Sequence, residues 1–371
     1  MAEKENYMRR AIELARNGQG WTNPNPLVGA VIVKDGNVIG EGWHHKYGEL
    51  HAEREALKNC RERGNDAAGA DIYVTLEPCC HFGKQPPCSQ ALVEAGIKRV
   101  FVGSRDPNPL VHGKGNAFLR ENGIEVIEDF LRQECDALNP IFFHYITTGR
   151  PYIALKYAMT ADGKIATKTG ASKWITGEKS RAYVHELRNR YAAILCGIGT
   201  VLADNPMLNC RMEGGHNPLR VICDSNLRIP LDCQIVKSAN EIPTIVACEE
   251  GVASGQEAAE KISALKTAGV EVLEFSASPE GGIDLEALVR TLGERKIDSL
   301  LIEGGSEINY SALKWGLVNR LYTFIAPKLF GGRAAKTPVA GAGIEGVEEA
   351  FTFRLSKIRQ FDDDILLEYE K

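Results

Sequence analysis

Residues 72–96 read IYVTLEPCCHFGKQPPCSQALVEAG, and this stretch decides the fold class. Ile72 to Leu76 form an apolar run rich in β-branched residues, which is typical of a buried strand. Residues 88–95 predict a short helix that ends at Gly96. Strands that alternate with short helices predict an α/β fold whose mixed or mostly parallel sheet is covered on both faces. The same alternation continues on both sides, with helices near 51–63 and 116–122 and strands near 99–103 and 124–127.

The chain before this stretch adds one helix and one hairpin. Residues 7–16 repeat apolar side chains at helical spacing and predict an opening helix. Residues 27–33 and 38–43 predict two strands, joined at Asp35-Gly36, because this pair favours the positive backbone angles of a tight hairpin turn. The first half therefore has a ββαβαβ layout after its opening helix.

The second half alternates again and predicts a second α/β domain. A helix-like stretch near 129–146 runs into Thr147-Thr148-Gly149-Arg150-Pro151, where glycine and proline interrupt regular structure. We therefore expect two domains, 1–148 and 151–371. In the second, strands are predicted near 152–159, 192–196, 219–223, 243–247, 270–275, 298–302, 320–326 and 363–369, and helices near 178–190, 256–267, 284–294 and 306–315.

Length and composition describe an ordinary globular chain. Its 371 residues correspond to two or three domains of ~150 residues. The net charge of -5 provides no overall positive field for nucleic acid or anionic lipid. The chain starts without an apolar signal core, and no apolar run reaches the ~18 residues of a membrane span. We expect a cytoplasmic protein whose partners include neither nucleic acid nor a membrane.

The ten cysteines divide into two groups. Seven are expected to be small buried hydrophobic residues: Cys60, Cys135, Cys196, Cys210, Cys223, Cys233 and Cys248. Cys79, Cys80 and Cys88 stand instead at the predicted strand-to-helix junction, and His51 stands at another such junction. Because a helix N-terminus lowers the pKa of a cysteine, these positions favour the thiolate that a metal requires.

The residues at these junctions predict a catalytic zinc site. We expect His51, Cys79 and Cys88 to be the ligands, because three protein ligands leave the fourth tetrahedral position open to water. Glu53 is expected to carry protons from that water to a departing amine. This chemistry is hydrolytic deamination, and the H-x-E and P-C motifs match the signature of zinc deaminases.

Several readings remain open around this site. Eight residues separate Cys79 from Cys88, where the zinc deaminase signature has two, so Cys80 or His81 could be a rival ligand. A structural zinc site or plain buried thiols are further alternatives. His81 and Lys84 could meet a polar or anionic substrate, and Asn25 and His44 could contact a pyrimidine. For these residues the alternatives are ordinary turn and surface roles, as they are for His45.

The chain resembles the bifunctional riboflavin-biosynthesis enzymes, which deaminate a phosphoribosylamino-pyrimidine and then reduce its ribose to ribitol. Residues 23–33, 51–53, 75–81 and 86–88 carry this resemblance. In that family the nine-residue step between the two cysteines is the usual form. The resemblance implies a cytidine-deaminase-like α/β/α domain at the N-terminus, zinc as a cofactor and a phosphorylated pyrimidine as substrate. We also expect a homo-oligomer.

The second half resembles the reductase of the same family, which is similar in fold to dihydrofolate reductase and uses NADPH. The matching stretches are 152–164, 172–177, 197–206 and 302–306. A Rossmann glycine fingerprint is absent from the sequence. The resemblance implies that the dinucleotide is lined by Ala158, Trp174, Thr200, Asp204, Ser225, Gly304 and Gly305. It implies that the substrate is held by Ser172, Arg188, Leu208, Arg211 and Glu303.

Arg188 and Arg211 together would suit a phosphate, because guanidinium groups are planar, charge-assisted donors. The plainer interpretation of Arg188 is a solvated side chain on an exposed helix. For the whole protein, the alternative function is a nucleic-acid or nucleoside base deaminase with an accessory α/β domain. Such an enzyme would need a basic groove, which the acidic composition disfavours. A zinc-stabilised binding protein without turnover would leave Glu53 unexplained.

Overall fold

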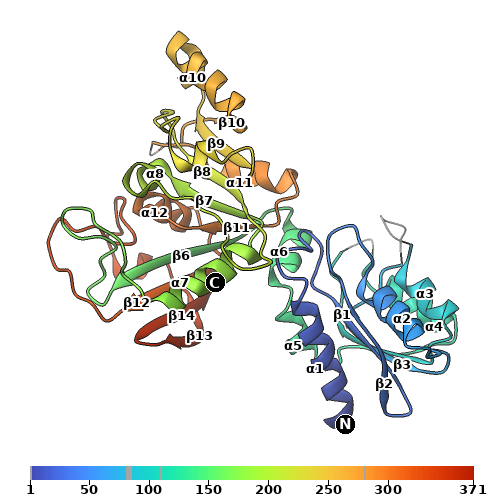
Figure 1. Ribbon diagram of the computed structural model, residues 1–371. Coiled ribbons are helices and arrows are strands. Elements are labelled where there is room, and N and C mark those ends of the chain that lie inside the picture. Colours follow the sequence, from blue (N-terminus) through green and yellow to red (C-terminus); the bar gives the residue numbers. More distant parts are fainter. Residues whose placement is uncertain (1, 81–85, 109–110, 280) are drawn as a thin grey trace. The chain divides into compact units, whose positions relative to one another are not determined.

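The computed structural model describes residues 2–80, 86–108, 111–279 and 281–371. The chain forms two compact units, Met1–Gly149 and Arg150–Lys371, each with its own sheet and cores (Figure 1). Among the described residues, no helix combines the length and apolar character needed to cross a bilayer.

The N-terminal unit is a five-stranded sheet between two layers of helices (Figure 1). The strand order is β2-β1-β3-β4-β5, with β1 antiparallel to both neighbours and β3, β4 and β5 parallel. The strands are β1 (Gly29–Lys34), β2 (Asn37–Trp43), β3 (Asp71–Leu76), β4 (Arg99–Ser104) and β5 (Glu125–Ile127). The helices are α1 (Ala2–Arg16), α2 (Ala52–Glu62), α3 (Cys88–Glu94), α4 (Lys114–Glu121), α5 (Arg132–Asp136) and α6 (Pro140–Thr148).

Two apolar clusters hold these layers together. One joins α1 and α5 to one face of the sheet and includes Met8, Tyr73 and Cys135. The other packs α2, α3 and α4 against the opposite face and includes Leu57 and Leu92. This arrangement places the N-termini of α2 and α3 beside the carboxyl end of β3, where the predicted metal ligands lie.

The helix predicted near 129–146 is wrong in one respect, because the structure divides it into α5 and α6. Pro140 is the first residue of α6, and proline has no N–H with which to continue a preceding helix. Asn139 occupies the break, and its side chain exchanges two hydrogen bonds of 2.8 Å with the backbone of Leu27. The break therefore ties α6 to the segment before β1.

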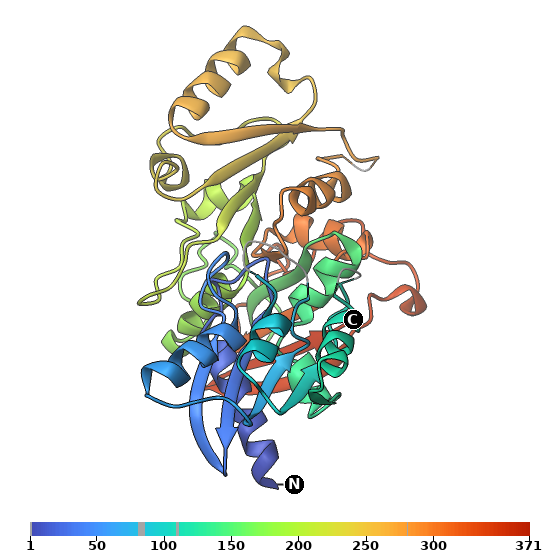
Figure 2. The same ribbon diagram turned by 90° about the vertical axis from the view of Figure 1, so that its right-hand side faces the viewer.

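The C-terminal unit contains a nine-stranded sheet of order β10-β9-β8-β7-β11-β6-β12-β14-β13. Figure 2 shows this sheet running from the yellow and orange β9 and β10 to the red β13. In this sheet β14 alone runs opposite to the other strands, because it is antiparallel to both β12 and β13. The strands are β6 (Tyr152–Thr160), β7 (Ala193–Gly197), β8 (Leu219–Cys223), β9 (Thr244–Glu249), β10 (Val270–Phe275), β11 (Ser299–Ile302), β12 (Arg320–Ala326), β13 (Arg354–Phe361) and β14 (Asp364–Glu370).

Helices and two further apolar clusters cover this sheet. The helices are α7 (Glu178–Arg190), α8 (Ile198–Asp204), α9 (Gln234–Lys237), α10 (Gln256–Thr267), α11 (Leu285–Glu294) and α12 (Ser306–Lys314), with short 3-10 turns at Val252–Ser254 and Val347–Glu349. The sequence did not predict β13, α8 or α9. β13 is an exposed edge strand, so its sequence RLSKIRQF shows no buried alternation. Of the seven cysteines expected in cores, six are buried and Cys210 is partly exposed.

Candidate functional site

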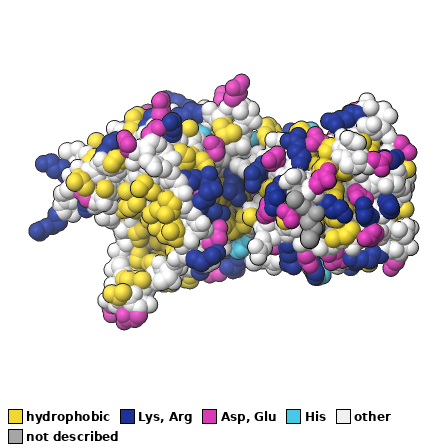
Figure 3. Space-filling view, turned by 90° about the horizontal axis from the view of Figure 1, so that it is seen from below, with side chains coloured by type: hydrophobic (Ala, Val, Ile, Leu, Met, Phe, Trp, Pro, Cys, Tyr) yellow, Lys and Arg dark blue, Asp and Glu magenta, His cyan; other side chains and the backbone are white. Residues whose placement is uncertain are grey.

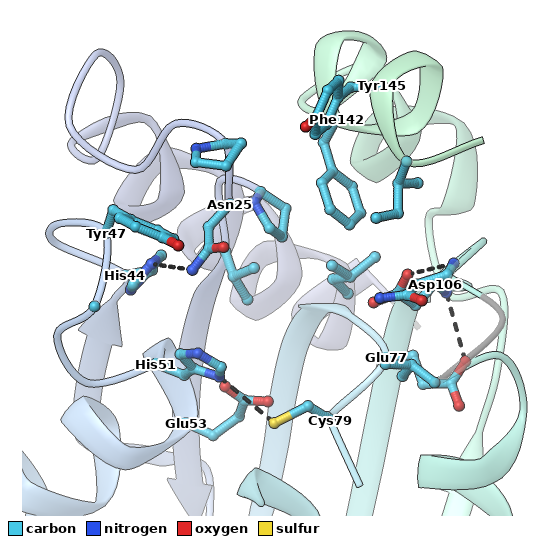
Figure 4. Close-up of a pocket in the computed structure, with 18 of the residues that line it drawn as sticks. Asn25, His44, Tyr47, His51, Glu53, Glu77, Cys79, Asp106, Phe142 and Tyr145 are labelled. Carbon is cyan, nitrogen blue, oxygen red and sulfur yellow. Dashed lines mark hydrogen bonds between the residues drawn. The ribbon is translucent and has the colours of Figure 1, made fainter. Parts of the chain in front are cut away.

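Three side chains from separate elements meet in the N-terminal unit. His51 immediately precedes α2, Cys79 follows β3, and Cys88 is the first residue of α3. His51 Nδ1 lies 3.5 Å from Cys79 Sγ and 3.4 Å from Cys88 Sγ. Figure 4 shows His51 and Cys79 facing each other, with Glu53 beside them. Within the described part of the chain, these residues form the only cluster of three potential metal ligands.

The spacing of this cluster fits zinc. Zn–N bonds of about 2.0–2.1 Å and Zn–S bonds of about 2.3 Å place tetrahedral ligands about 3.4–3.8 Å apart. The pKa of Cys79 falls to about 4, mainly because the Cys88 thiol hydrogen-bonds to it and also because His51 lies beside it. The backbone N–H of Cys88 adds a further donor 3.3 Å from Cys79 Sγ. The donor set therefore holds the thiolate that zinc prefers, and the rival Cys80 is not part of it.

Glu53 lies at the bottom of a cavity of about 300 Å³ that also contains His51 and Cys79. Its side chain is buried at the start of α2, and the pKa of Glu53 rises to about 6, first through burial and then through the negative charge of Cys79. A carboxyl group whose pKa is near neutral can both take up and release a proton.

His44 and Asn25 form a second polar pair in this cavity (Figure 4). His44 Nδ1 lies 3.0 Å from the carbonyl oxygen of Leu50, so this nitrogen carries the proton. Its Nε2 then accepts a hydrogen bond of 3.1 Å from the Asn25 amide nitrogen. The imidazole stays neutral, since burial lowers the pKa of His44 to about 4. His44 is thus buried and holds the amide of Asn25, whereas His45 is exposed and stacks on Trp43.

The opposite wall contains residues that the sequence analysis missed. Asp106 and Asn108 come from the loop after β4, and Phe142 and Tyr145 come from α6 (Figure 4). Burial raises the pKa of Asp106 to about 6. The sequence hardly indicated Asp106 and Asn108 as cavity residues, because Asp-Pro-Asn is typical of an ordinary turn. The predicted substrate residues His81 and Lys84 lie outside the described residues.

Glu77, next to the metal-ligand turn, fixes this wall in place. Its buried carboxylate accepts hydrogen bonds of 3.1 to 3.5 Å from the backbone N–H groups of Asp106, Gly113, Gly115 and Asn116. The start of α4 is packed so tightly that a Cβ on Gly115 would lie 2.0 Å from the carbonyl oxygen of Pro78. One carboxylate therefore joins the end of β3 to the loop that carries Asp106.

The C-terminal unit has a separate cavity of about 450 Å³ at the carboxyl ends of β7 and β8. Five residues predicted for the reductase line it: Ser172, Thr200, Asp204, Ser225 and Gly305. Ser172 donates a hydrogen bond of 3.0 Å to Asp204. Gly304 precedes Gly305, and a Cβ on it would lie 3.7 Å from Thr200 Oγ1. Ala158 and Trp174 are not lining residues, and the exposed Trp174 ring stacks under the Arg181 guanidinium.

A buried ion cluster lies at the end of β11. Arg188 donates from Nε and Nη2 to the two oxygens of Glu303, at 2.7 and 2.9 Å, and Lys156 lies 3.5 Å from the same carboxylate. Burial raises the pKa of Glu303, but Arg188 and Lys156 outweigh it and lower the pKa to about 2. The interpretation of Arg188 as a solvated side chain is therefore wrong, and no sequence motif pointed to Lys156.

The remaining two predicted substrate residues lie close to this cluster. Arg188 Nη1 donates 3.0 Å to the carbonyl oxygen of Asn209, which follows the buried Leu208. Arg211 is exposed, and its Nε lies 3.2 Å from the ring of His185. Since Glu303 occupies most of the Arg188 guanidinium, Arg211 is the more open cation of the predicted pair.

Comparison with known proteins assigns a family model to each of the two units. Residues 1–104 match the cytidine and deoxycytidylate deaminase zinc-binding region, and residues 151–367 match the RibD C-terminal domain. The chain is 56% identical to the riboflavin biosynthesis protein RibD of Actinobacillus pleuropneumoniae, over 98% of this chain and 94% of that protein. The chain belongs to the RibD family.

Solved RibD-family structures share the fold over the whole chain. A diaminohydroxyphosphoribosylaminopyrimidine deaminase/5-amino-6-(5-phosphoribosylamino)uracil reductase of Thermotoga maritima is 41% identical with a TM-score of 0.87, covering 100% of this chain and 99% of that one. RibD of Acinetobacter baumannii is 38% identical, also with a TM-score of 0.87 and the same coverage. The predicted family and the predicted fold class, a deaminase-like unit followed by a reductase unit, are confirmed. Membership in the RibD family weighs against a nucleic-acid base deaminase.

Proposed function

We propose that the N-terminal unit hydrolyses the exocyclic amine of 2,5-diamino-6-(5-phosphoribosylamino)pyrimidin-4-one, and that the C-terminal unit then reduces the ribose to ribitol phosphate with NADPH. The observation that carries the first step is the His51, Cys79 and Cys88 cluster with Glu53 in the same cavity. The second step is supported by the cavity at the strand ends of a reductase unit of the RibD family.

In the deaminase site, His51, Cys79 and Cys88 would hold the zinc. Zinc held there would lower the pKa of water and would so make water a competent nucleophile near neutral pH. Glu53 takes the proton of the attacking water and delivers it to the departing amine, which leaves as ammonia. The Asn25 amide nitrogen donates to His44, and its carbonyl oxygen accepts no hydrogen bond from the described residues, so this oxygen would meet the pyrimidine.

In the reductase site, bound NADPH would supply the hydride for C1 of the ribose in its imine form, and the imine nitrogen would take up a proton from solvent. Thr200, Ser225 and Gly305 line the cavity that would hold the dinucleotide. Glu303 is the polar group that would meet the ribose, and Arg188 fixes its carboxylate through two hydrogen bonds. The protein mainly positions hydride donor and acceptor at reacting distance.

We also propose that the enzyme is a homo-oligomer. Figure 3 shows hydrophobic side chains gathered on the C-terminal unit, at the left of the view. The edge strand β13 and its neighbour β14 expose Leu355, Ile358 and Ile365, and contiguous exposed apolar side chains of this kind often mark protein–protein contacts. Light scattering at several protein concentrations tests this proposal, and a monomer at all of them would reject it. A cytoplasmic location stays a prediction.

The decisive experiment supplies the diaminopyrimidine and follows ammonia release and NADPH oxidation together. Glu53→Gln should retain one zinc per chain, lose about 10²–10⁴-fold in deamination and still reduce the deaminated intermediate, because only the proton carrier is removed. Glu62→Gln, on the exposed end of the same helix, is the matched control. Removing zinc with a chelator should abolish ammonia release alone.

Two results would contradict the proposal. Ammonia release without NADPH oxidation would leave a lone deaminase and remove the function of the C-terminal unit. Full deaminase activity in Glu53→Gln would reject the assigned proton carrier.

A further inference from the structure

Arg228 lines the C-terminal cavity just beyond the end of β8. Its Nε lies 3.8 Å from Oδ1 of Asp224, a carboxylate with no exposed surface. The other oxygen of Asp224 accepts a hydrogen bond of 2.7 Å from the backbone N–H of Ile229, whereas Oδ1 has no hydrogen-bond partner among the described residues. A buried carboxylate therefore holds the charge of Arg228 near the cavity through a long ion pair.

The donors of this guanidinium remain open. In the part of the chain that the structure describes, no oxygen accepts a hydrogen bond from Arg228, and 56% of its side chain is exposed. Ser225 lines the same part of the cavity. An arginine with free planar donors beside a hydroxyl group is suited to a phosphate.

The strand order shows which part of a dinucleotide would reach Arg228. Along this edge of the sheet the order is β8, β7, β11 and β6. Gly199 and Gly305 follow the two middle strands, β7 and β11. A Cβ added to Gly199 would meet no atom within 4 Å, and one added to Gly305 would meet only Thr200 Oγ1, at 3.6 Å. Because these two glycines carry no side chain, a pyrophosphate can come close to their backbone N–H groups.

The buried ion cluster fixes the direction of the dinucleotide. Lys156 lies on β6 and Glu303 follows β11, so the proposed ribose site is at the β11 and β6 end. Hydride transfer requires the nicotinamide at that end. The adenosine must then extend across β7 to the end of β8, where Ser225 and Arg228 lie.

NADPH differs from NADH by one phosphate on the adenosine ribose, and dinucleotide sites commonly accommodate this 2′-phosphate with an arginine. Near β8 the described lining residues are Ser225, Arg228, Ser278, Gly281 and Gly282, of which only Arg228 is charged. The other lining cation, Lys336, lies away from β8, because its backbone carbonyl oxygen accepts a hydrogen bond from Ile165 in the loop after β6. We propose that Arg228 selects NADPH over NADH by binding the 2′-phosphate, an inference that rests on the proposed reductase function.

The test compares two small probes and two cofactors on the full-length protein. Calorimetry measures the affinity for 2′,5′-ADP, which carries the phosphate, and for 5′-AMP, which lacks it. Arg228→Gln should bind 2′,5′-ADP roughly 30-fold more weakly, equal to about 2 kcal/mol, and bind 5′-AMP within about twofold of the wild type. The ratio of kcat/KM for NADPH to that for NADH should fall by a similar factor. Arg228→Lys retains the charge and should recover part of the loss.

Lys336→Gln is the matched control, because it removes a cation from the same cavity and should leave both ratios unchanged. The proposal is overturned if Arg228→Gln weakens both probes equally, or if Lys336→Gln changes the ratios instead. A wild-type protein that neither binds 2′,5′-ADP nor oxidises NADPH would overturn the reductase function together with this proposal. NADPH oxidation with an unchanged ratio in Arg228→Gln would overturn the role of Arg228 alone.

Discussion

Glu77 provides the sharpest test of how the deaminase cavity is built. Its two oxygens accept four backbone N–H groups, and each oxygen serves two of them: Oε2 accepts from Asp106 and Gly113, and Oε1 accepts from Gly115 and Asn116. The perturbation is Glu77→Gln, which keeps the shape but replaces one oxygen by an NH2 group. That group donates hydrogen bonds, so two backbone N–H groups lose their acceptor.

The expected cost follows from the two orphaned donors. A buried donor without a partner costs ~1–3 kcal/mol, so the N-terminal unit should lose about 2–6 kcal/mol of unfolding free energy. In a domain of this size each kcal/mol lowers the melting temperature by about 2–4 °C, so a loss near 4 kcal/mol corresponds to roughly 8–16 °C. The loop with Asp106 and Asn108 should also become less ordered, which raises the KM of deamination.

Differential scanning calorimetry and steady-state kinetics check this expectation. Zinc content should stay near one per chain, because His51, Cys79 and Cys88 are untouched, and NADPH-dependent reduction should not change. Glu94→Gln, on the exposed side of α3, is the control and should shift stability by no more than about 0.5 kcal/mol. If Glu77→Gln melts with the wild type and keeps its KM, the carboxylate does not organise the cavity wall.

Two further predictions concern the reductase unit. Burial and the neighbouring Arg188 lower the pKa of His185 to about 4, so His185 is neutral in the folded protein. The unfolded chain binds a proton at this histidine below its ordinary pKa of about 6.5. The unit should therefore lose stability as pH falls from 6.5 to 4. The urea unfolding midpoint should change less with pH in His185→Gln than in the wild type. The same pH dependence in both proteins would exclude His185 as the cause. Arg188→Met leaves Glu303 with Lys156 alone and should cost about 3–5 kcal/mol. Urea unfolding beside the exposed-helix control Arg290→Met measures this cost, and equal values would show that the pair contributes nothing.

Local sequence could predict that the three proposed ligands meet, because their geometry depends on local junctions. His51 and Cys88 stand at helix starts and Cys79 follows a strand, so a correct alternation of strands and helices already brings them to one sheet edge. The proposed proton-carrying role of Glu53 was predicted from its position two residues after His51. The sequence alone could not choose Cys79 over Cys80, since both precede the same loop.

Residues whose roles depend on distant partners were not predictable. Arg188 looked solvated because its partner Glu303 lies 115 positions further along the chain. Phe142 faces the deaminase cavity only because Pro140 divides a helix that periodicity alone would have kept continuous. β13 gave no signal, because an exposed edge strand has no buried face to impose alternation.

The position of α6 decides how long a fragment that carries the deaminase alone must be. The match to the zinc-binding region ends at residue 104, yet Asp106, Phe142 and Tyr145 all line the cavity beyond that point. A fragment shortened to residue 104 would keep every proposed ligand and lose one whole side of the substrate chamber. A fragment designed to carry the deaminase alone should therefore extend to Thr148, the last residue of α6.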